Sequence, residues 1–298
     1  MANEQRKEPQ LSVIIPVYNG AAYIDACMNM LLTQALPPDE VIFVDDASED
    51  ETLSLCHAWQ NRMPSLVRVE HLPVNMGPGA ARNKGIAVAK GTFLSFIDVD
   101  DSLCHQFFAQ LTQRILESNA EVSVCGMTIA DSNNEQTVLP PKKEMAYAIL
   151  QKGKILYSPC NKMYRRSFLT ENTIYFANCR IGEDMAFAVR LFTLSPKVAC
   201  VPAALYVYTR RQGSLCSSLE LRNEIFVALQ EIRTSLHDSG VWRKYAPLYL
   251  SLCLLHAVYY PAHLYVTSFI RREHERKFVA LSFWRYLLSG IHFLRGGR

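Results

Sequence analysis

The chain has 298 residues, of which 49% are hydrophobic and 20% are charged, and this composition excludes an intrinsically disordered protein. Its formal net charge is only +3, so we expect no nucleic-acid partner. The segment 271–298 carries seven Lys and Arg against Glu273 and Glu275, so the positive charge belongs to the C-terminal end of the chain.

The first hundred residues alternate strand and helix patterns. A possible capping box, with Ser48 three residues before Glu51, predicts the start of one helix at Ser48. Apolar strand patterns lie at 11–18, 40–45, 66–72 and 92–98, and helical patterns at 21–34, from 48 and at 77–89. This alternation predicts an α/β fold with a mostly parallel central sheet, in which ligands bind beyond the carboxyl ends of the strands.

The pattern continues less regularly towards the C-terminus. The polar stretch 131–143 is typical of a loop, and no clear periodicity follows it before residue 183. Further elements are predicted as a helix at 107–117, a strand at 121–129, a helix at 183–192, a short strand at 205–208 and helices from 219 onward.

Asp98 and Asp100 follow the apolar run 92–97 at the end of a predicted strand. Residues two apart in an extended chain project to the same side, so both carboxylates point together while Asp101 enters the following loop. Such carboxylates repel each other unless a divalent cation binds them, and oxygen ligands favour Mg²⁺ or Mn²⁺. The pattern therefore predicts a metal site, and the alternative is a solvated acidic turn.

Asp45 and Asp46 end the strand predicted at 40–45. A carboxylate at this point can accept a hydrogen bond from the imide N–H of uracil or from a ribose hydroxyl. The alternative is a cluster that caps the next helix, a role that suits Ser48 and Asp50.

The segment Asn75–Asn83 opens the helix predicted at 77–89. Gly77 and Gly79 permit a ligand to approach the backbone closely, and Arg82 could contact a diphosphate. The third glycine of a dinucleotide site is absent, so we do not expect one. The alternative is that the small residues pack the helix on the sheet.

Glu183 and Asp184 begin the helix predicted at 183–192, directly after Gly182. An anionic side chain is stabilised at a helix N-terminus, so simple capping explains the motif taken alone. The functional interpretation is a general base that faces the substrate.

Taken together, these motifs resemble the family 2 glycosyltransferases of the GT-A fold. The resemblance runs from Leu11 to about Ser217 and implies a catalytic domain over residues 1–218, followed by a helical region over 219–298. It is carried by seven segments in the family's order, at residues 12–19, 44–50, 75–83, 96–101, 161–165, 182–184 and 206–214.

The resemblance implies a role for each matching position. Asp98 and Asp100 match the family's DxD motif, which binds the Mn²⁺ or Mg²⁺ ion that bridges the donor diphosphate, and Asp184 matches the catalytic base. Pro16, Tyr18, Asn19 and Asp46 match positions that hold the uridine. The full set expected to bind the nucleotide-sugar is Pro16, Tyr18, Asn19, Asp46, Asn75, Gly77, Arg82, Asp98, Asp101, Lys162 and Arg211.

The function that the resemblance implies is an inverting transfer of a sugar from a UDP-sugar to a hydroxyl of a glycan or lipid-linked saccharide in surface polysaccharide synthesis. Asp184 would take the hydroxyl proton, while the metal, Arg82 and Arg211 stabilise the leaving diphosphate. The first alternative is a nucleotide-sugar-binding protein that lacks transferase activity. A nucleotidyltransferase is the second, but the turn at 19–22 lacks the basic, Gly-rich signature that it needs.

Three positions depart from the family pattern. Ala47 stands where the family often has Gly, and Cys160 stands where an aromatic residue is common. No His near Ser214 is present to act as a further metal ligand.

The C-terminal region has features of a membrane-surface helix. Residues 246–270 carry no charge and are long enough to span a bilayer, but Pro261 and several polar residues interrupt them. We expect helices that pack on the catalytic domain and contact an anionic membrane, and the alternatives are an ordinary helical cap or a true transmembrane span. Nine cysteines without metal-ligand spacing and a polar N-terminus predict a cytoplasmic location, at the inner face of the membrane.

Overall fold

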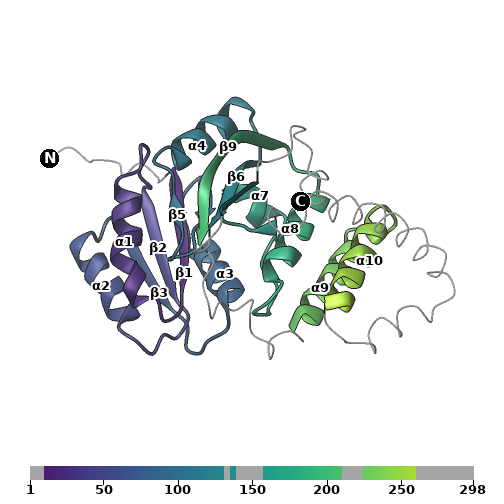
Figure 1. The fold of residues 1–298 in the computed structure, drawn as a ribbon, viewed down its shortest axis with the longest axis horizontal. Coiled ribbons are helices and arrows are strands. Elements are labelled where there is room, and N and C mark those ends of the chain that lie inside the picture. The colour runs from purple at the N-terminus through teal and green to yellow at the C-terminus, as the bar shows by residue number, and fades with distance from the viewer. Residues whose placement is uncertain (1–9, 131–134, 139–156, 210–223, 260–298) are drawn as a thin grey trace.

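The computed structural model of this chain describes residues 10–130, 135–138, 157–209 and 224–259. Within these residues, nine strands form one sheet in the order β3-β2-β1-β4-β8-β6-β9-β5, and β7 pairs with β6. Helices cover the sheet (Figure 1), so the predicted α/β class is confirmed.

The first part of the sheet is parallel, as the sequence predicts. Strands β1, β2 and β4 are buried along their whole length, which is expected where helices cover both faces of a sheet. The elements of this part are β1 (Leu11–Val17), α1 (Ala21–Leu32), β2 (Glu40–Asp45), α2 (Thr52–Arg62), β3 (Val67–His71), α3 (Pro78–Val88) and β4 (Phe93–Phe96).

The second part of the sheet is mixed. Strand β8 is antiparallel to both β4 and β6, whereas β9 runs parallel to β6 and antiparallel to β5. Parallel pairing is therefore confined to the β1–β4 group and to β6 with β9. The strands of this part are β5 (Ser102–Leu103), β6 (Val122–Ala130), β7 (Glu135–Val138), β8 (Lys162–Arg165) and β9 (Val198–Thr209).

Three of these strands are absent from the sequence prediction. β7 lies inside the stretch predicted as a loop at 131–143, so that prediction is wrong for residues 135–138, and the rest of the stretch lies outside the described residues. β5 and β8 have two and four residues and are too short to show a periodicity. β9 contains the predicted strand at 205–208 but begins at Val198, where it pairs with β6.

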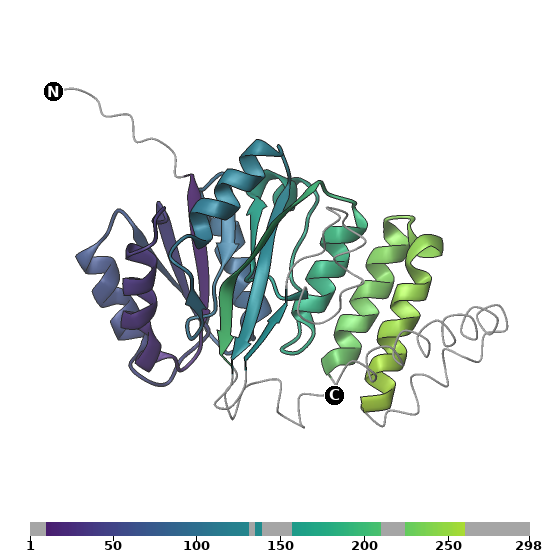
Figure 2. The ribbon, with the colours of Figure 1, turned by 45° about the horizontal axis from the view of Figure 1, so that its top comes forward.

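The helices of the second half confirm the predictions at 107–117, 183–192 and beyond 219. Helix α9 lies beside α8 and α10 lies beside α9, at the end of the molecule opposite α1 and α2 (Figures 1 and 2). These helices are α4 (Phe107–Glu117), α7 (Arg166–Glu171, not predicted), α8 (Glu183–Thr193), α9 (Ile225–Asp238) and α10 (Trp242–Tyr259).

The described helices include none with both the length and the apolar character that a membrane span requires. Helix α10 covers only the start of the segment 246–270 and contains Pro247; residues 260–270 lie outside the described residues. The division of the chain at 218/219 also lies outside them and stays a prediction.

The helix predicted to begin at Ser48 begins at Thr52, so the capping-box prediction is wrong. The Ser48 hydroxyl accepts a hydrogen bond from the Asn19 N–H at 2.9 Å, and Glu51 makes no capping hydrogen bond. Ser48 therefore links the ends of β1 and β2. Asp50 partly fills the capping role, because it accepts from the Thr52 N–H at 3.0 Å.

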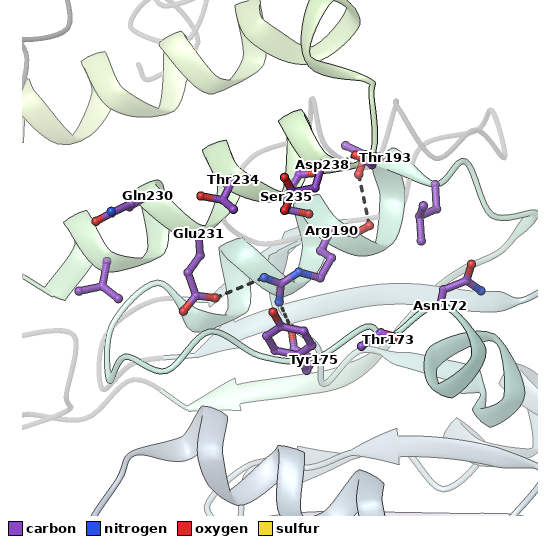
Figure 3. A pocket seen from close by; sticks show the side chains of 13 residues that line it. Asn172, Thr173, Tyr175, Arg190, Thr193, Gln230, Glu231, Thr234, Ser235 and Asp238 are labelled. Carbon is purple, nitrogen blue, oxygen red and sulfur yellow. Dashed lines mark hydrogen bonds and ion pairs between the residues drawn. The ribbon is translucent and has the colours of Figure 1, made fainter.

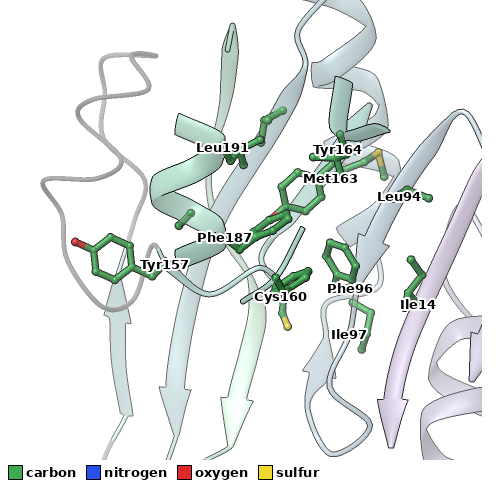
Figure 4. Close-up of a cluster of buried hydrophobic side chains, with 14 of the residues drawn as sticks. Ile14, Leu94, Phe96, Ile97, Tyr157, Cys160, Met163, Tyr164, Phe187 and Leu191 are labelled. Carbon is green, nitrogen blue, oxygen red and sulfur yellow. The ribbon is translucent and has the colours of Figure 1, made fainter. Parts of the chain in front are cut away.

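An aromatic cluster joins β4, β8 and α8 in the core (Figure 4). The rings of Phe176 and Phe187 stack with centroids 4.0 Å apart, and Phe96 meets both edge-on at 5.3 and 6.0 Å. Tyr164 lies 5.7 Å from Phe187. Such pairs stabilise a core beyond their burial, so this cluster fixes the start of α8 relative to the end of β4.

Candidate active site

The carboxyl ends of β1, β2 and β4 meet at one edge of the sheet. Val17 pairs with Asp45, and the Asp46 N–H donates to the Val17 carbonyl at 2.8 Å. Lys162 starts β8 at the same edge, because β8 is antiparallel to β4. The structure thus brings the predicted residues of the first, second and fourth strand ends together with Lys162.

The end of β1 is held in a strained turn. Pro16 is buried within β1, whereas the Tyr18 side chain is 44% exposed. Asn19 has a left-handed φ of 49° and accepts from the Glu49 N–H at 2.8 Å. Non-glycine residues in this region are uncommon and gather at functional sites, so Tyr18 is presented to solvent from a fixed backbone.

Ala47 shows the same strain at the end of β2, with a φ of 60°. This conformation costs an L-residue other than glycine roughly 1–2 kcal/mol. The family that the chain resembles often has Gly at this position, and glycine adopts this backbone conformation without strain.

Asp46 anchors the loop between β3 and α3. Its two carboxylate oxygens accept from the N–H groups of Met76 and Gly77, each at 2.7 Å, and the residue is only 3% exposed. Burial raises the pKa of Asp46, and the two N–H groups partly offset that effect. A carboxylate has lone pairs left after two such bonds, so a contact with uridine remains compatible with this geometry and stays a prediction.

The same loop presents Asn75 in an exposed position and needs glycine at 77. Gly77 has a φ of 88°, and a Cβ there would lie 2.7 Å from the Arg180 Cγ. Pro78 follows at the start of α3, where its missing N–H costs nothing. The backbone of this loop is therefore fixed against Asp46 on one side and Arg180 on the other.

Arg82 lies buried between the metal-site motif and the start of α8. Its guanidinium donates to Asp98 Oδ1 at 2.7 Å and to Glu183 Oε1 at 3.1 Å, and the residue is 4% exposed. Burial alone lowers the pKa of Arg82, but the charges of Asp98 and Glu183 more than offset it and raise that pKa overall. No described residue accepts a hydrogen bond from its Nε. In this arrangement Arg82 holds two carboxylates; its predicted contact with a diphosphate stays a prediction.

Asp101 accepts hydrogen bonds from two residues of β9. Its oxygens accept from the Tyr206 hydroxyl at 2.6 Å and the Thr209 N–H at 3.1 Å. Burial and the charge of Asp98 raise the pKa of Asp101 to about 7. Asp101 therefore joins the motif to the sheet, and its expected contact with the sugar or metal is untested.

The magnesium or manganese site expected at Asp98 and Asp100 stays a prediction, with which the surroundings of Asp98 are compatible. The Asp98 side chain is 33% exposed and only one of its oxygens is bound to Arg82. Among the described residues, no group of three or more His, Cys, Asp and Glu side chains is arranged to hold a metal. Mg²⁺ commonly uses one or two carboxylates with substrate phosphates as the other ligands, so the donor set suits an ion that binds together with a diphosphate.

The start of α8 presents Asp184 beside Glu183. Gly182 precedes the helix with a left-handed φ of 87°, and Asp184 accepts a hydrogen bond from the Met185 N–H at 2.6 Å. Burial raises the pKa of Asp184, whereas that N–H and the charge of Arg82 lower it. Burial and the charge of Asp184 raise the pKa of Glu183. Asp184 is half-buried, and its second oxygen makes it a possible proton acceptor.

Lys162 lies beneath this edge and is 1% exposed. Its ammonium donates to the Ser158 carbonyl at 2.5 Å and to Asn161 Oδ1 at 2.7 Å. Burial lowers the pKa of Lys162 to about 7. Arg211 and Ser214, by contrast, lie outside the described residues.

Two residues that organise this site have no assigned role in the sequence analysis. The Tyr206 hydroxyl, besides its bond to Asp101, accepts from the Asp98 N–H at 3.4 Å. Asn83 exchanges two hydrogen bonds with the backbone of Phe176, at 2.8 and 3.0 Å. Both residues join segments about a hundred residues apart, so no local spacing in the sequence indicates these contacts. The motifs at 75–83 and 206–214 contain the two residues but do not identify their partners.

Comparison with known proteins gives a consistent family assignment. The family described as glycosyl transferase family 2 matches residues 12–172, more than half of the chain. An uncharacterized glycosyltransferase, EpsJ of Bacillus subtilis, is 29% identical over 220 residues, which are 70% of this chain and 63% of EpsJ. The poly(ribitol-phosphate) beta-N-acetylglucosaminyltransferase TarS of Staphylococcus aureus is 30% identical over 231 residues, which are 75% of this chain and 39% of TarS.

The fold is also shared with a solved structure. A crystal structure of S. aureus TarS 1–349 in complex with UDP has 25% sequence identity and a TM-score of 0.65, over 90% of this chain and 77% of the other. The chain thus spans less than two thirds of the length of EpsJ and of TarS.

Proposed function

Because the chain belongs to glycosyl transferase family 2, we propose that it transfers a sugar from a UDP-sugar to a hydroxyl of a glycan or lipid-linked saccharide acceptor in surface polysaccharide synthesis. One observation carries the proposal. The buried Arg82 joins Asp98 to Glu183, the neighbour of Asp184, so the diphosphate site and the base that we assign to Asp98 and Asp184 would lie on either side of one guanidinium.

The donor is held along the strand ends. We assign the uridine to the turn with Tyr18 and Asn19 and to Asp46, with Asn75 and Gly77 at the loop that Asp46 anchors. The TarS structure with UDP supports a uridine nucleotide, because its fold covers most of this chain. On this assignment the diphosphate lies towards Asp98 and Asp100.

Asp98 and Asp100 would hold a Mn²⁺ or Mg²⁺ ion, with Asp101 fixed behind them by β9. When bound, such an ion supplies positive charge to the diphosphate and so stabilises its departure from the sugar. Arg82 keeps one oxygen of Asp98 in a fixed direction, and Lys162 and Arg211 are assigned near the donor phosphates or the acceptor.

Asp184 acts as the general base. It removes the proton of the acceptor hydroxyl while the hydroxyl oxygen attacks the anomeric carbon on the face opposite the leaving UDP, which inverts the configuration. Burial raises the pKa of Asp184, and a more basic carboxylate takes up a proton more readily. The Met185 N–H fixes one of its oxygens and leaves the other for the acceptor.

The alternative, a nucleotide-sugar-binding protein without transferase activity, is not favoured. The chain keeps both the paired aspartates and Asp184 at the start of α8, whereas a protein that only bound the donor would need no base. We further assign the enzyme to the cytoplasm, at the inner face of the membrane, on the basis of the basic segment 271–298. Deleting that segment should reduce co-sedimentation with anionic liposomes; unchanged co-sedimentation would remove the membrane assignment.

The test of the reaction is a screen of UDP-sugars for UDP release in the presence of Mn²⁺, with UDP affinity measured by calorimetry. Asp100→Ala should abolish Mn²⁺-dependent UDP binding. Asp184→Asn should keep UDP affinity but lower turnover by about 10²–10⁴-fold, the usual contribution of a general base. Turnover retained in Asp184→Asn would contradict its role, and unchanged UDP affinity in Asp100→Ala would contradict the metal site.

A further inference from the structure

An open cavity lies between α8, α9 and the segment 172–175, away from the strand ends that carry Asp46 and Asp98 (Figure 3). Its volume is about 540 Å³, within the range of sites that bind small molecules. Arg190 and Thr193 line it from the C-terminal end of α8, and Asp184 lies at the opposite end of the same helix. Asp184 and Thr193 are nine residues apart, which corresponds to about 14 Å along the helix axis.

Most residues that line this groove carry a polar group in the side chain, while the surface that they leave open is more apolar than polar. Eleven of its thirteen residues carry hydroxyl, amide or charged side chains, including Thr234, Ser235 and Gln230 on α9. Typical pockets for apolar ligands are lined mainly by hydrophobic side chains with a few polar groups. A hydroxyl-rich ligand, which can donate to and accept from many such groups at once, suits this composition better.

Two aliphatic side chains and the ring of Tyr175 are exposed in the groove. Tyr175 is 45% exposed, Leu194 40% and Val227 42%. They come from three different segments, and none of them belongs to the hydrophobic core of the described residues. An aromatic ring and aliphatic side chains beside polar groups can cover the C–H faces of a sugar ring while its hydroxyls are hydrogen-bonded.

The groove is held in shape before any ligand binds. The Arg190 guanidinium lies 3.9 Å from the centroid of the Tyr175 ring, donates to the Tyr175 carbonyl at 2.6 Å and pairs with Glu231 at 3.3 Å (Figure 3). Thr173 has a left-handed φ of 52°, a strained conformation for a β-branched residue. A fixed ring and a strained loop reduce the ordering cost of binding.

The charges of the groove disfavour anions. Its one cation, Arg190, is paired with Glu231, and Asp238 adds a further carboxylate for which no ion pair is found among the described residues. Phosphate groups, nucleic acids and anionic lipid headgroups would therefore be repelled or left unpaired. Neutral sugars can instead donate their hydroxyl protons to both carboxylates.

We propose that the groove formed by Tyr175, Arg190, Leu194, Val227, Glu231 and Asp238 is a secondary binding site for a neutral oligosaccharide segment of the glycan acceptor. The inference rests on the proposed function, since a glycan acceptor is what brings such a chain to the enzyme. Holding part of the glycan away from its reacting end raises the effective concentration of that end at Asp184 between transfers.

The proposal is tested on the full chain with Mn²⁺ and saturating UDP, by saturation-transfer NMR with three probes: chitopentaose, cellopentaose and maltopentaose. At least one pentasaccharide should bind in the millimolar range. Tyr175→Ala and Asp238→Asn should each weaken that binding about tenfold, and Tyr175→Phe should retain it. Leu36→Ser is the control, because Leu36 has an exposure of 38% and lies outside the groove.

The outcomes separate this proposal from the assigned reaction. Binding that is weakened in Tyr175→Ala and Asp238→Asn, but kept in Leu36→Ser, supports the groove. Failure of all three pentasaccharides to bind, or binding that survives both groove variants, would overturn it. UDP affinity, measured on the same samples, should be unchanged in every variant; a wild-type chain that does not bind UDP would instead contradict the proposed function.

Discussion

The edge of the sheet where β1, β2 and β4 end has two halves, one at β1 and β2 and one at β4 and the start of α8. The two halves hold their acidic side chains by different means. At the ends of β1 and β2, backbone N–H groups do so: Met76 and Gly77 donate to Asp46, and Thr52 donates to Asp50. At β4 and α8, side chains act together with the backbone N–H groups of Thr209 and Met185, which donate to Asp101 and Asp184. Arg82 holds Asp98 and Glu183, and Tyr206 holds Asp101.

The difference separates robust positions from vulnerable ones. A backbone donor survives most substitutions at its own residue, because every residue except proline has an N–H. A side-chain donor is lost with one substitution, and a buried charge without its partner is costly. We therefore expect the β1–β2 half to tolerate single changes and the β4–α8 half to depend on a few residues.

The largest effect is expected for Arg82→Met. The change removes a buried cation that pairs with Asp98 and Glu183, and breaking such a pair costs about 3–5 kcal/mol of unfolding free energy. Denaturant unfolding gives the value. Arg180→Met is the matched control, because Arg180 is 44% exposed in its pair with Glu224 and should lose about 1 kcal/mol or less. Equal losses of unfolding free energy in Arg82→Met and Arg180→Met would contradict the special dependence of the β4–α8 half on its buried side chains.

A pH-dependent effect of intermediate size is expected for Lys162. Burial lowers its pKa from 10.5 to about 7, so between these values the unfolded chain binds one proton more than the folded chain. The unfolding free energy contributed by Lys162 therefore rises with pH across this window, by up to about 1.4 kcal/mol per pH unit.

Lys162→Met should lack this rise. The measurement is the difference in unfolding free energy between wild type and variant at several pH values within the window, with the exposed Lys90→Met as control. Parallel profiles for wild type and Lys162→Met would show that Lys162 does not titrate as a buried group. The β4–α8 half would then be less dependent on buried cations than the structure indicates.

The smallest effect, and the only stabilising one, is expected for Ala47→Gly. Glycine relieves the left-handed φ of 60°, which costs roughly 1–2 kcal/mol, but loses about 0.5–1 kcal/mol of chain entropy. The net gain should be below about 1 kcal/mol, seen as a higher melting temperature. Ala89→Gly, at a φ of −64°, should destabilise the protein. A loss of stability in both variants would mean that the turn at Ala47 is not strained.

The same contrast explains what the sequence could predict. Strands β1, β2 and β4 are continuous apolar runs, so their positions and the polar groups at their ends follow from local pattern. The position of Asp184 at a helix start follows likewise. These local signals, together with the ordered motifs, were enough to predict the fold class and the glycosyltransferase family, which the structure and comparisons confirm.

Non-local partners were beyond such reasoning. The sequence around Ser48 indicates a helix cap, yet its hydroxyl accepts a hydrogen bond from the N–H of Asn19, 29 residues away. Arg82 pairs with Glu183, 101 residues away, and no spacing distinguishes that contact from a contact with a diphosphate. β8 is only four residues long, and its place between β4 and β6 is decided by pairing rather than by its own periodicity.

The link between Tyr206 and Asp101 has a consequence for the order in which the protein is made. The loop that carries Asp98 and Asp101 is fixed by partners 105 and 108 residues later in the chain, Tyr206 and Thr209. Contacts between residues so distant in sequence form late in folding, because the entropic cost of closing the long loop between them must be met first. During synthesis the β1–β2 part can therefore fold first, and we expect the nascent chain to acquire its metal-site loop only after Thr209 has left the ribosome.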